Sequence, residues 1–134
     1  VAFVRGFGLK TGALASSLSW DCSNLVVVGA NDEDMACAVN RIVELQGGFV
    51  ICHKNQILEE LPLPIFGVVS DLPIEEVARK MVSLTRLAQS LGSELASPLL
   101  SLQTLAFTAL PYLRVTDRGL VDIRAKRIVD LVVV

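Results

Sequence analysis

A stripe of apolar side chains at helical spacing runs through residues 74–91, and it constrains the fold more than any other feature of the sequence. Its members step by three and four residues: Ile74, Val77, Met81, Leu84, Ala88 and Leu91. That spacing places them on one face of an α-helix. Asp71 is predicted to cap this helix, Pro73 to lie in its first turn and Gly92 to end it. One long apolar face needs a cover, so we expect a sheet beside it.

A second helix is predicted over residues 31–48, with both of its ends marked in the sequence. Asn31 can cap the first turn, and the acidic run 32–34 lies where the helix dipole favours negative charge. Apolar residues then recur at helical spacing: Met35, Val39, Ile42 and Leu45. Gly47 and Gly48 are predicted to supply the left-handed conformation that ends the helix. The acidic run is therefore assigned to the helix cap in preference to a cation site.

The remaining elements predict an α+β fold. A third helix is expected from Ser97 and Pro98 to Pro111, and it is apolar on most sides, which predicts burial or a partner. Strands are expected over 1–8, 12–19, 24–30 as a central strand, 48–61 around a Lys54–Asn55 turn, 114–123 around a turn at 117–119, and 127–134. Strands and helices are partly segregated along the chain. We therefore expect one domain over residues 1–134, with a mixed, largely antiparallel sheet and about three helices packed on it.

Composition narrows the function classes. Apolar residues make up 52% of the chain, and the mean hydropathy is +0.57, which predicts a sheet covered on both faces or a face reserved for another domain or subunit. The formal charge of −2 and the absence of a basic run exclude non-specific nucleic-acid binding. No apolar stretch approaches the ~20 residues of a membrane span. Cys22, Cys37 and Cys52 form no C-x-x-C pair, and no signal peptide is apparent, so free thiols in the cytoplasm are predicted.

Two motifs with possible chemistry fail closer tests. The run "GFGLKTG" at 6–12 has Thr11 where a dinucleotide loop needs glycine, and a strand is expected after it instead of a helix. His53 is the only histidine, and its neighbour Cys52 should point to the opposite face of a strand. We favour a surface histidine, and we expect no cofactor or metal ion in this chain, because one histidine cannot supply a histidine-rich metal centre.

The run "SWDCSN" at 19–24 is the one group of residues for which a functional interpretation remains reasonable. It places Trp20, Asp21, Ser23 and Asn24 close together before an apolar strand. In a structural interpretation, Asp21 and Asn24 satisfy free backbone groups of a turn between two strands. In a functional one, the four residues form a polar rim at the edge of a neighbouring site. Both interpretations stay open at this point.

Four stretches in register resemble the C-terminal domain of bacterial and archaeal adenine deaminases, members of the amidohydrolase superfamily. They are "RGFGLKTGALASS", "VVVGANDEDMACAVNRIVELQGG", "LEELPLPIFGVVSD" and "VTDRGLVDI", and the resemblance holds from about residue 3 to the end. It implies a parent enzyme, expected to be a homo-oligomer, that hydrolyses adenine to hypoxanthine and ammonia. It also implies that a divalent manganese or iron ion is held by an upstream (β/α)-barrel, the expected partner of this chain. This chain would then be an accessory domain, inactive alone.

The chain departs from that family at the polar run. Family members typically read His-Asp-Ser-His-Asn there, whereas this chain has Trp20 and Ser23 at the two histidine positions. If those histidines assist the active site, this protein has lost that help, and its parent acts on another amine or acts weakly. If they are structural, the change is harmless. A stand-alone binding or oligomerisation module without an enzymatic parent is the alternative from a different class.

Overall fold

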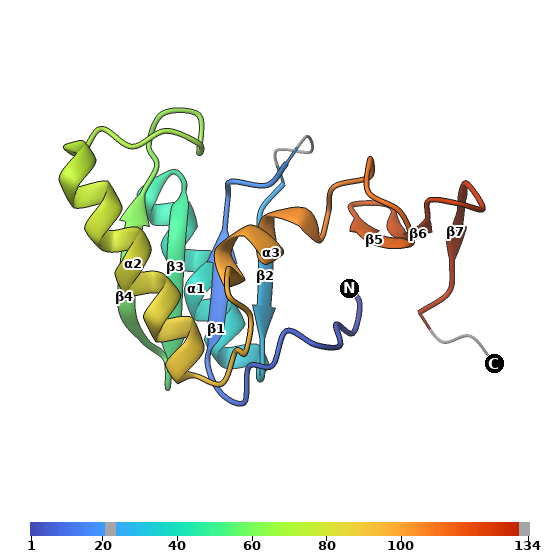
Figure 1. Ribbon diagram of the computed structural model, residues 1–134, viewed down its shortest axis with the longest axis horizontal. Helices are drawn as coiled ribbons and strands as arrows, with labels where there is room; N and C mark the ends of the chain where they lie inside the picture. The colour runs from blue at the N-terminus through green and yellow to red at the C-terminus, as the bar shows by residue number, and fades with distance from the viewer. Residues whose placement is uncertain (21–23, 132–134) are drawn as a thin grey trace.

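The computed structural model describes residues 1–20 and 24–131, and in these ranges seven strands form two antiparallel sheets alongside three helices (Figure 1). The larger sheet has the order β2-β1-β3-β4, and the smaller has the order β5-β6-β7. The elements are β1 (Ala13–Ser16), β2 (Val26–Gly29), α1 (Asp32–Leu45), β3 (Gly48–His53), β4 (Gln56–Pro62), α2 (Ile74–Ser90), α3 (Pro98–Thr104), β5 (Leu113–Thr116), β6 (Gly119–Asp122) and β7 (Arg127–Val129). The predicted α+β class with three helices is confirmed, and the strands pair antiparallel in two sheets.

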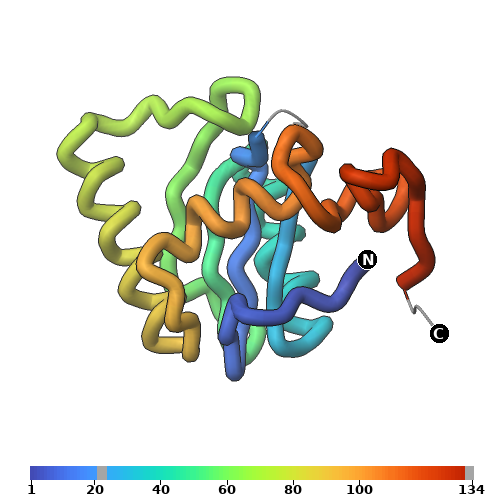
Figure 2. The backbone as a smooth tube through the Cα atoms, turned by 45° about the vertical axis from the view of Figure 1, so that its right-hand side comes forward, coloured from blue at the N-terminus to red at the C-terminus, as the bar shows by residue number. Residues whose placement is uncertain are grey.

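The four-stranded sheet lies between two helical layers (Figures 1 and 2). One face packs on α1 through small side chains and a few larger ones: Ala13, Ala15, Ala38, Ile42, Val50 and Cys52. The other face packs on α2 and α3 through larger side chains: Leu14, Phe49, Ile51, Leu61, Leu84, Ala88, Leu99 and Leu102. Alternate residues of a strand point to opposite faces, so β1 and β3 are buried on both sides. Part of the apolar excess is thus used inside the domain, whereas large apolar side chains such as Phe3, Phe66 and Ile74 stay exposed.

Three predicted elements differ from the structure because of contacts that are distant in sequence. Residues 1–8 form no strand, and Gly6 and Gly8 there have φ angles of 90° and 85°. Strand β2 is at the edge of its sheet and not in its centre, because β1 pairs with β2 on one side and β3 on the other. The third helix ends at Thr104 and not at Pro111. Beyond it, the Leu105 carbonyl accepts the Val115 N–H at 3.1 Å, which directs the chain into the smaller sheet.

The hairpin expected at 117–119 is confirmed by β5 and β6, whereas the last predicted strand is shorter than expected. Strand β7 ends at Val129, and residues 132–134 lie outside the described part. The hairpin at Lys54–Asn55 is also confirmed, and both residues adopt the left-handed conformation with φ of 52° and 58°. Such a pair is typical of the two-residue turns that match the twist of antiparallel strands.

The helix ends were predicted with mixed success. Asn31 caps α1 as expected, because its Oδ1 accepts the Asp34 N–H at 2.8 Å. The left-handed residue that ends α1 is Gln46, with φ of 60°, one position before Gly47. Asp71 does not cap α2. Pro73 precedes the first helical residue, without a capping side chain, and its carbonyl accepts the first helical bonds.

The Asp34 carboxylate joins the start of α1 to the β3–β4 turn. Its Oδ1 accepts the Asn55 N–H at 2.8 Å, and its Oδ2 accepts the Asn31 side-chain amide at 2.9 Å. The residue is only 3% exposed. Burial by itself raises the pKa of Asp34, but the hydrogen bonds from Asn55 and Asn31 outweigh it and hold the pKa below its usual value. The acidic run is therefore a helix start that also holds a neighbouring turn.

Strand β4 is tied to the helices on both faces of the sheet by two adjacent glutamates. Glu60 receives two parallel hydrogen bonds from the Arg41 guanidinium of α1, at 2.7 and 2.9 Å. Glu59 pairs with Lys80 of α2 at 3.0 Å. The Arg41 hydrogen bond, more than any other contact, lowers the pKa of Glu60.

Among the described helices, none is both long and apolar enough to cross a bilayer.

Replacing Leu84 by Ala is expected to lower the free energy of unfolding by about 2–5 kcal/mol. Leu84 is fully buried between α2 and the sheet, so the shorter side chain leaves a cavity. Val82→Ala on the same helix is the control, because Val82 is 50% exposed. Urea denaturation measures both variants. Equal effects of the two substitutions would contradict the packing described above.

Replacing Asp34 by Asn is expected to cost about 1–3 kcal/mol at pH 7, because the new amide nitrogen meets the Asn31 amide donor. The folded-state pKa of Asp34 is lowered, so its carboxylate stabilises the fold above the ordinary value of about 4. That contribution disappears as the pH falls through the folded-state pKa. The difference between the two proteins should therefore shrink in acid.

Unfolding at a series of pH values, with the exposed Asp32→Asn as control, measures this difference. A gap between wild type and Asp34→Asn that stays constant from neutral pH into acid would show that the Asp34 carboxylate is not the source of the stability.

Candidate functional site

The polar run at 19–24 forms the connection between β1 and β2. Ser19 Oγ donates to the Asn24 carbonyl at 2.7 Å and accepts the Asn24 N–H at 3.1 Å, which closes the connection. Asn24 thus takes part through its backbone, whereas its side chain was predicted to satisfy free backbone groups. Asp21 and Ser23, the other two candidates, lie outside the described residues, as does Cys22. Strands β1 and β2 lie on either side of the run, and the turn itself stays a prediction.

Trp20 attaches this connection to the end of α3. Its indole N–H donates to Gln103 Oε1 at 2.9 Å, and its backbone N–H donates to the Gln103 carbonyl at 3.3 Å. The indole ring also lies 5.6 Å from the Phe107 ring in a tilted arrangement, a favourable geometry for two aromatic rings. Trp20 nevertheless remains 48% exposed. Gln103 was missed in the sequence, although it is a polar residue within an otherwise largely apolar helical stretch.

His53 and Cys52 approach one carboxylate from two sides. His53 Nδ1 lies 3.0 Å from Thr11 Oγ1 and 4.0 Å from Asp34 Oδ2, while the Cys52 thiol donates to Asp34 Oδ1 at 3.7 Å. The expectation that the two side chains diverge was wrong, because both approach the Asp34 carboxylate. The β3–β4 pairing is irregular between Ile51 and Cys52. The histidine is also more enclosed than predicted, with 24% of its side chain exposed.

This cluster lacks the properties of a nucleophilic or metal-binding site. Burial, together with the neighbouring Cys37 thiol and the Asp34 carboxylate, raises the pKa of Cys52 to about 12, so the thiol stays protonated at neutral pH. Within residues 1–20 and 24–131, no three histidine, cysteine or acidic side chains are grouped to hold a metal ion. The side chains present do not fit the metal ion implied by the family resemblance. We therefore assign them no step of metal chemistry.

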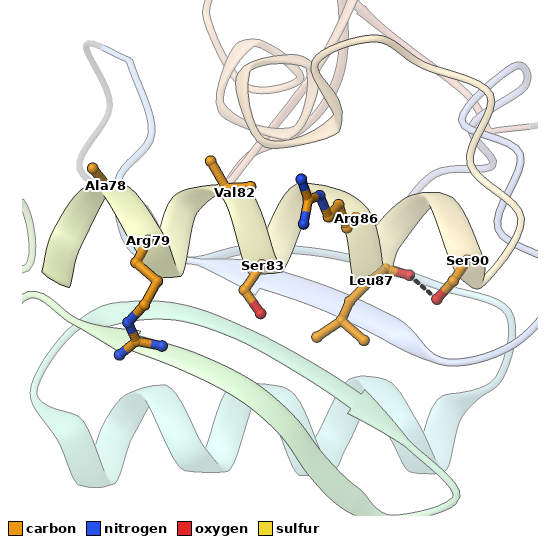
Figure 3. Close-up of a pocket in the computed structure, with 7 residues that line it drawn as sticks. All are labelled: Ala78, Arg79, Val82, Ser83, Arg86, Leu87 and Ser90. Atoms are coloured by element: carbon orange, nitrogen blue, oxygen red, sulfur yellow. Dashed lines mark hydrogen bonds between the residues drawn. The ribbon is translucent and has the colours of Figure 1, made fainter. Parts of the chain in front are cut away.

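Two shallow hollows mark the surface, and neither combines an acid with a base for catalysis. The first runs along α2, and Figure 3 shows that all of its lining residues come from that one helix: Ala78, Arg79, Val82, Ser83, Arg86, Leu87 and Ser90. The second lies between α1 and β4, where Arg41, Glu44 and Glu60 already pair with one another. The run 6–12 is not a phosphate loop, because β1 follows it as predicted.

The sequence matches the family model described as the adenine deaminase C-terminal domain over residues 1–127. Similar proteins include the adenine deaminases of Brucella abortus, at 50% identity over 121 residues, Methylobacterium nodulans, at 49% over 126 residues, and Moorella thermoacetica, at 47% over 132 residues. These matches cover 90%, 94% and 98% of this chain, but only 21%, 22% and 22% of the relatives. The chain thus spans about a fifth of the length of the curated relatives that it matches. It belongs to the adenine deaminase C-terminal domain family.

Proposed function

We propose that this chain is the accessory C-terminal domain of an adenine deaminase, and that the remaining polypeptide converts adenine to hypoxanthine and ammonia. The observation that carries this proposal is a family match along nearly the whole chain, to a region that makes up about a fifth of each relative. The side-chain inventory supports it. One histidine in 134 residues is too few for a histidine-rich hydrolytic centre.

The proposal places the divalent manganese or iron ion of the parent enzyme outside this chain, in an upstream (β/α)-barrel of the amidohydrolase type. The barrel would be the principal partner of this domain. The thiols of Cys37 and Cys52 are free, which fits the reducing cytoplasm that we propose for the parent enzyme. The homo-oligomeric state stays a prediction from the family resemblance.

The contacts of Trp20 favour a packing role at the edge of a cleft over a role in proton transfer. An indole N–H only donates a hydrogen bond, whereas a histidine both accepts and releases a proton near neutral pH. Trp20 uses that donor on Gln103 and leaves about half of its surface open. We propose that the open part of the ring contacts the catalytic domain.

A second candidate function follows from Trp20 and a neighbouring residue. Trp20 and Ser23 stand where family members typically carry histidine, and these changes allow a parent amidohydrolase that acts on an amine other than adenine. The two candidates share the accessory role of this chain. They differ only in the substrate of the parent.

Ammonia release tests the proposed function. The full-length polypeptide that carries this chain, loaded with manganese or iron, is expected to release ammonia from adenine, whereas the 134-residue chain with the same metal is not. A panel of aminated purines distinguishes the second candidate. Release of ammonia from adenine by the short chain would refute the accessory role, and activity of the long chain on another purine alone would favour the second candidate.

Replacing Trp20 by Phe tests the packing role. The variant keeps an aromatic ring beside Phe107 but loses the indole hydrogen bond to Gln103 Oε1, so a cost of about 1 kcal/mol in unfolding free energy is expected. Trp20→Ala removes both contacts and should cost more. Denaturation of the 134-residue chain measures both variants. Unchanged stability of Trp20→Ala would show that the indole does not hold the connection to α3.

A further inference from the structure

The loop between β4 and α2 presents a cluster of apolar side chains to solvent. We call residues 64–69 the Phe66 loop. Its exposed members are Ile65 at 45%, Phe66 at 93%, Val68 at 39% and Val69 at 50%. Residues 61–70 contain no charged side chain. A contiguous exposed apolar group of this kind marks a surface that is covered by another part of the protein or by a partner.

This loop is held in one conformation by hydrogen bonds to the sheet. Ser17 Oγ donates to the Gly67 carbonyl at 2.6 Å and accepts the Gly48 N–H at 2.8 Å. The loop is also closed on itself, because Ile65 and Val69 exchange backbone hydrogen bonds at 3.2 and 3.1 Å. Gly47 permits the close approach, since a Cβ there would lie 2.4 Å from the Gly67 Cα. The apolar side chains are therefore presented by a fixed scaffold.

The backbone at Phe66 is strained, and the described residues give its side chain almost no burial in exchange. Its φ angle is +55°, a conformation that glycine and asparagine adopt readily and aromatic residues rarely do. The side chain is 93% exposed, so it gains almost no burial in exchange. Backbone strain of this kind clusters at functional sites, and aromatic side chains are enriched at protein interfaces. A stabilising contact of the Phe66 ring is therefore expected from outside the described residues.

The Phe66 loop lies at the same end of the four-stranded sheet as the connection that carries Trp20. Figures 1 and 2 both show the loop after β4 beside the chain that leaves β1. Ser17, which binds the loop, is three residues before Trp20. Two partly or fully exposed aromatic rings, at 48% and 93%, thus belong to one end of the domain.

We infer that the Phe66 loop is the docking surface for the N-terminal part of the same polypeptide, with Phe66 as its anchor. About four-fifths of the length of the relatives lies outside the matched region, and a parent of that length would offer a large partner surface. A second copy of this chain fits less well. The described hollows that could receive a ring are shallow and flanked by charges, including Arg79 and Arg86 on α2. The inference rests on the proposed role as one domain of a longer deaminase.

Phe66→Asn tests the inference, because asparagine tolerates the positive φ angle but removes the ring. In the 134-residue chain this variant is expected to raise the melting temperature by about 2–4 °C or leave it unchanged. In the full-length polypeptide it should lower the melting temperature of this domain. Amide hydrogen exchange of the two unmodified proteins gives a second readout, and exchange at 65–69 should be at least about tenfold slower in the full-length polypeptide.

Tyr112→Asn is the control, and it differs in one respect, because the Arg124 guanidinium lies 4.2 Å from the Tyr112 ring. Tyr112 also has a positive φ angle, 70°, and is 61% exposed, but it lies outside the loop. Its replacement is expected to shift both proteins in the same direction. Equal effects of Phe66→Asn in both proteins, together with equal exchange at 65–69, would overturn the inference. So would a concentration-dependent dimer of the short chain that Phe66→Asn abolishes. None of these measurements depends on ammonia release, so a failed activity test is distinguishable from a failed docking test.

Discussion

Burial of β1 and β3 on both faces is the constraint on which the rest of this domain depends. Each strand must offer suitable side chains to two different helical layers. Ala13 and Ala15 leave room for α1 to approach closely, while Leu14 and Phe49 fill the thicker layer under α2 and α3. The positions of all three helices follow from this division. Residues 17–20 and the Phe66 loop are then placed at one end of the same sheet (Figure 2).

The sequence predicted those helices, caps and turns that depend on residues close to one another along the chain. The apolar periodicities of α1 and α2, the Asn31 cap and the Lys54–Asn55 turn depend on residues within a few positions of one another, and all are confirmed. Asp71 failed as a cap because the path of the preceding loop decides which side chain reaches a helix end. The edge position of β2 depends on the pairing of β1 with β3, which is distant in sequence.

The candidate site was predictable only in part, because several of its contacts join residues that are distant in sequence. For the run at 19–24 the sequence left a turn between strands and a polar rim both open, and the Ser19–Asn24 contacts fit the turn. The attachment of Trp20 to Gln103 joins residues 83 positions apart, and no spacing rule indicates such a pair. The meeting of Cys52 and His53 at Asp34 was likewise hidden, because it requires α1 to pack beside the β3–β4 turn.

The two glutamates of β4 give the four-stranded sheet two unlike edges. On the β4 side, Glu59 and Glu60 are held by cations from both helical layers, and Lys80 Nζ also donates to the Glu60 carbonyl. Charged edges of this kind resist the addition of a further strand. On the β2 side, the outermost strand consists of three valines and a glycine. The charges on β4 therefore oppose the addition of a strand on that side, whereas β2 carries no charged side chain to do the same.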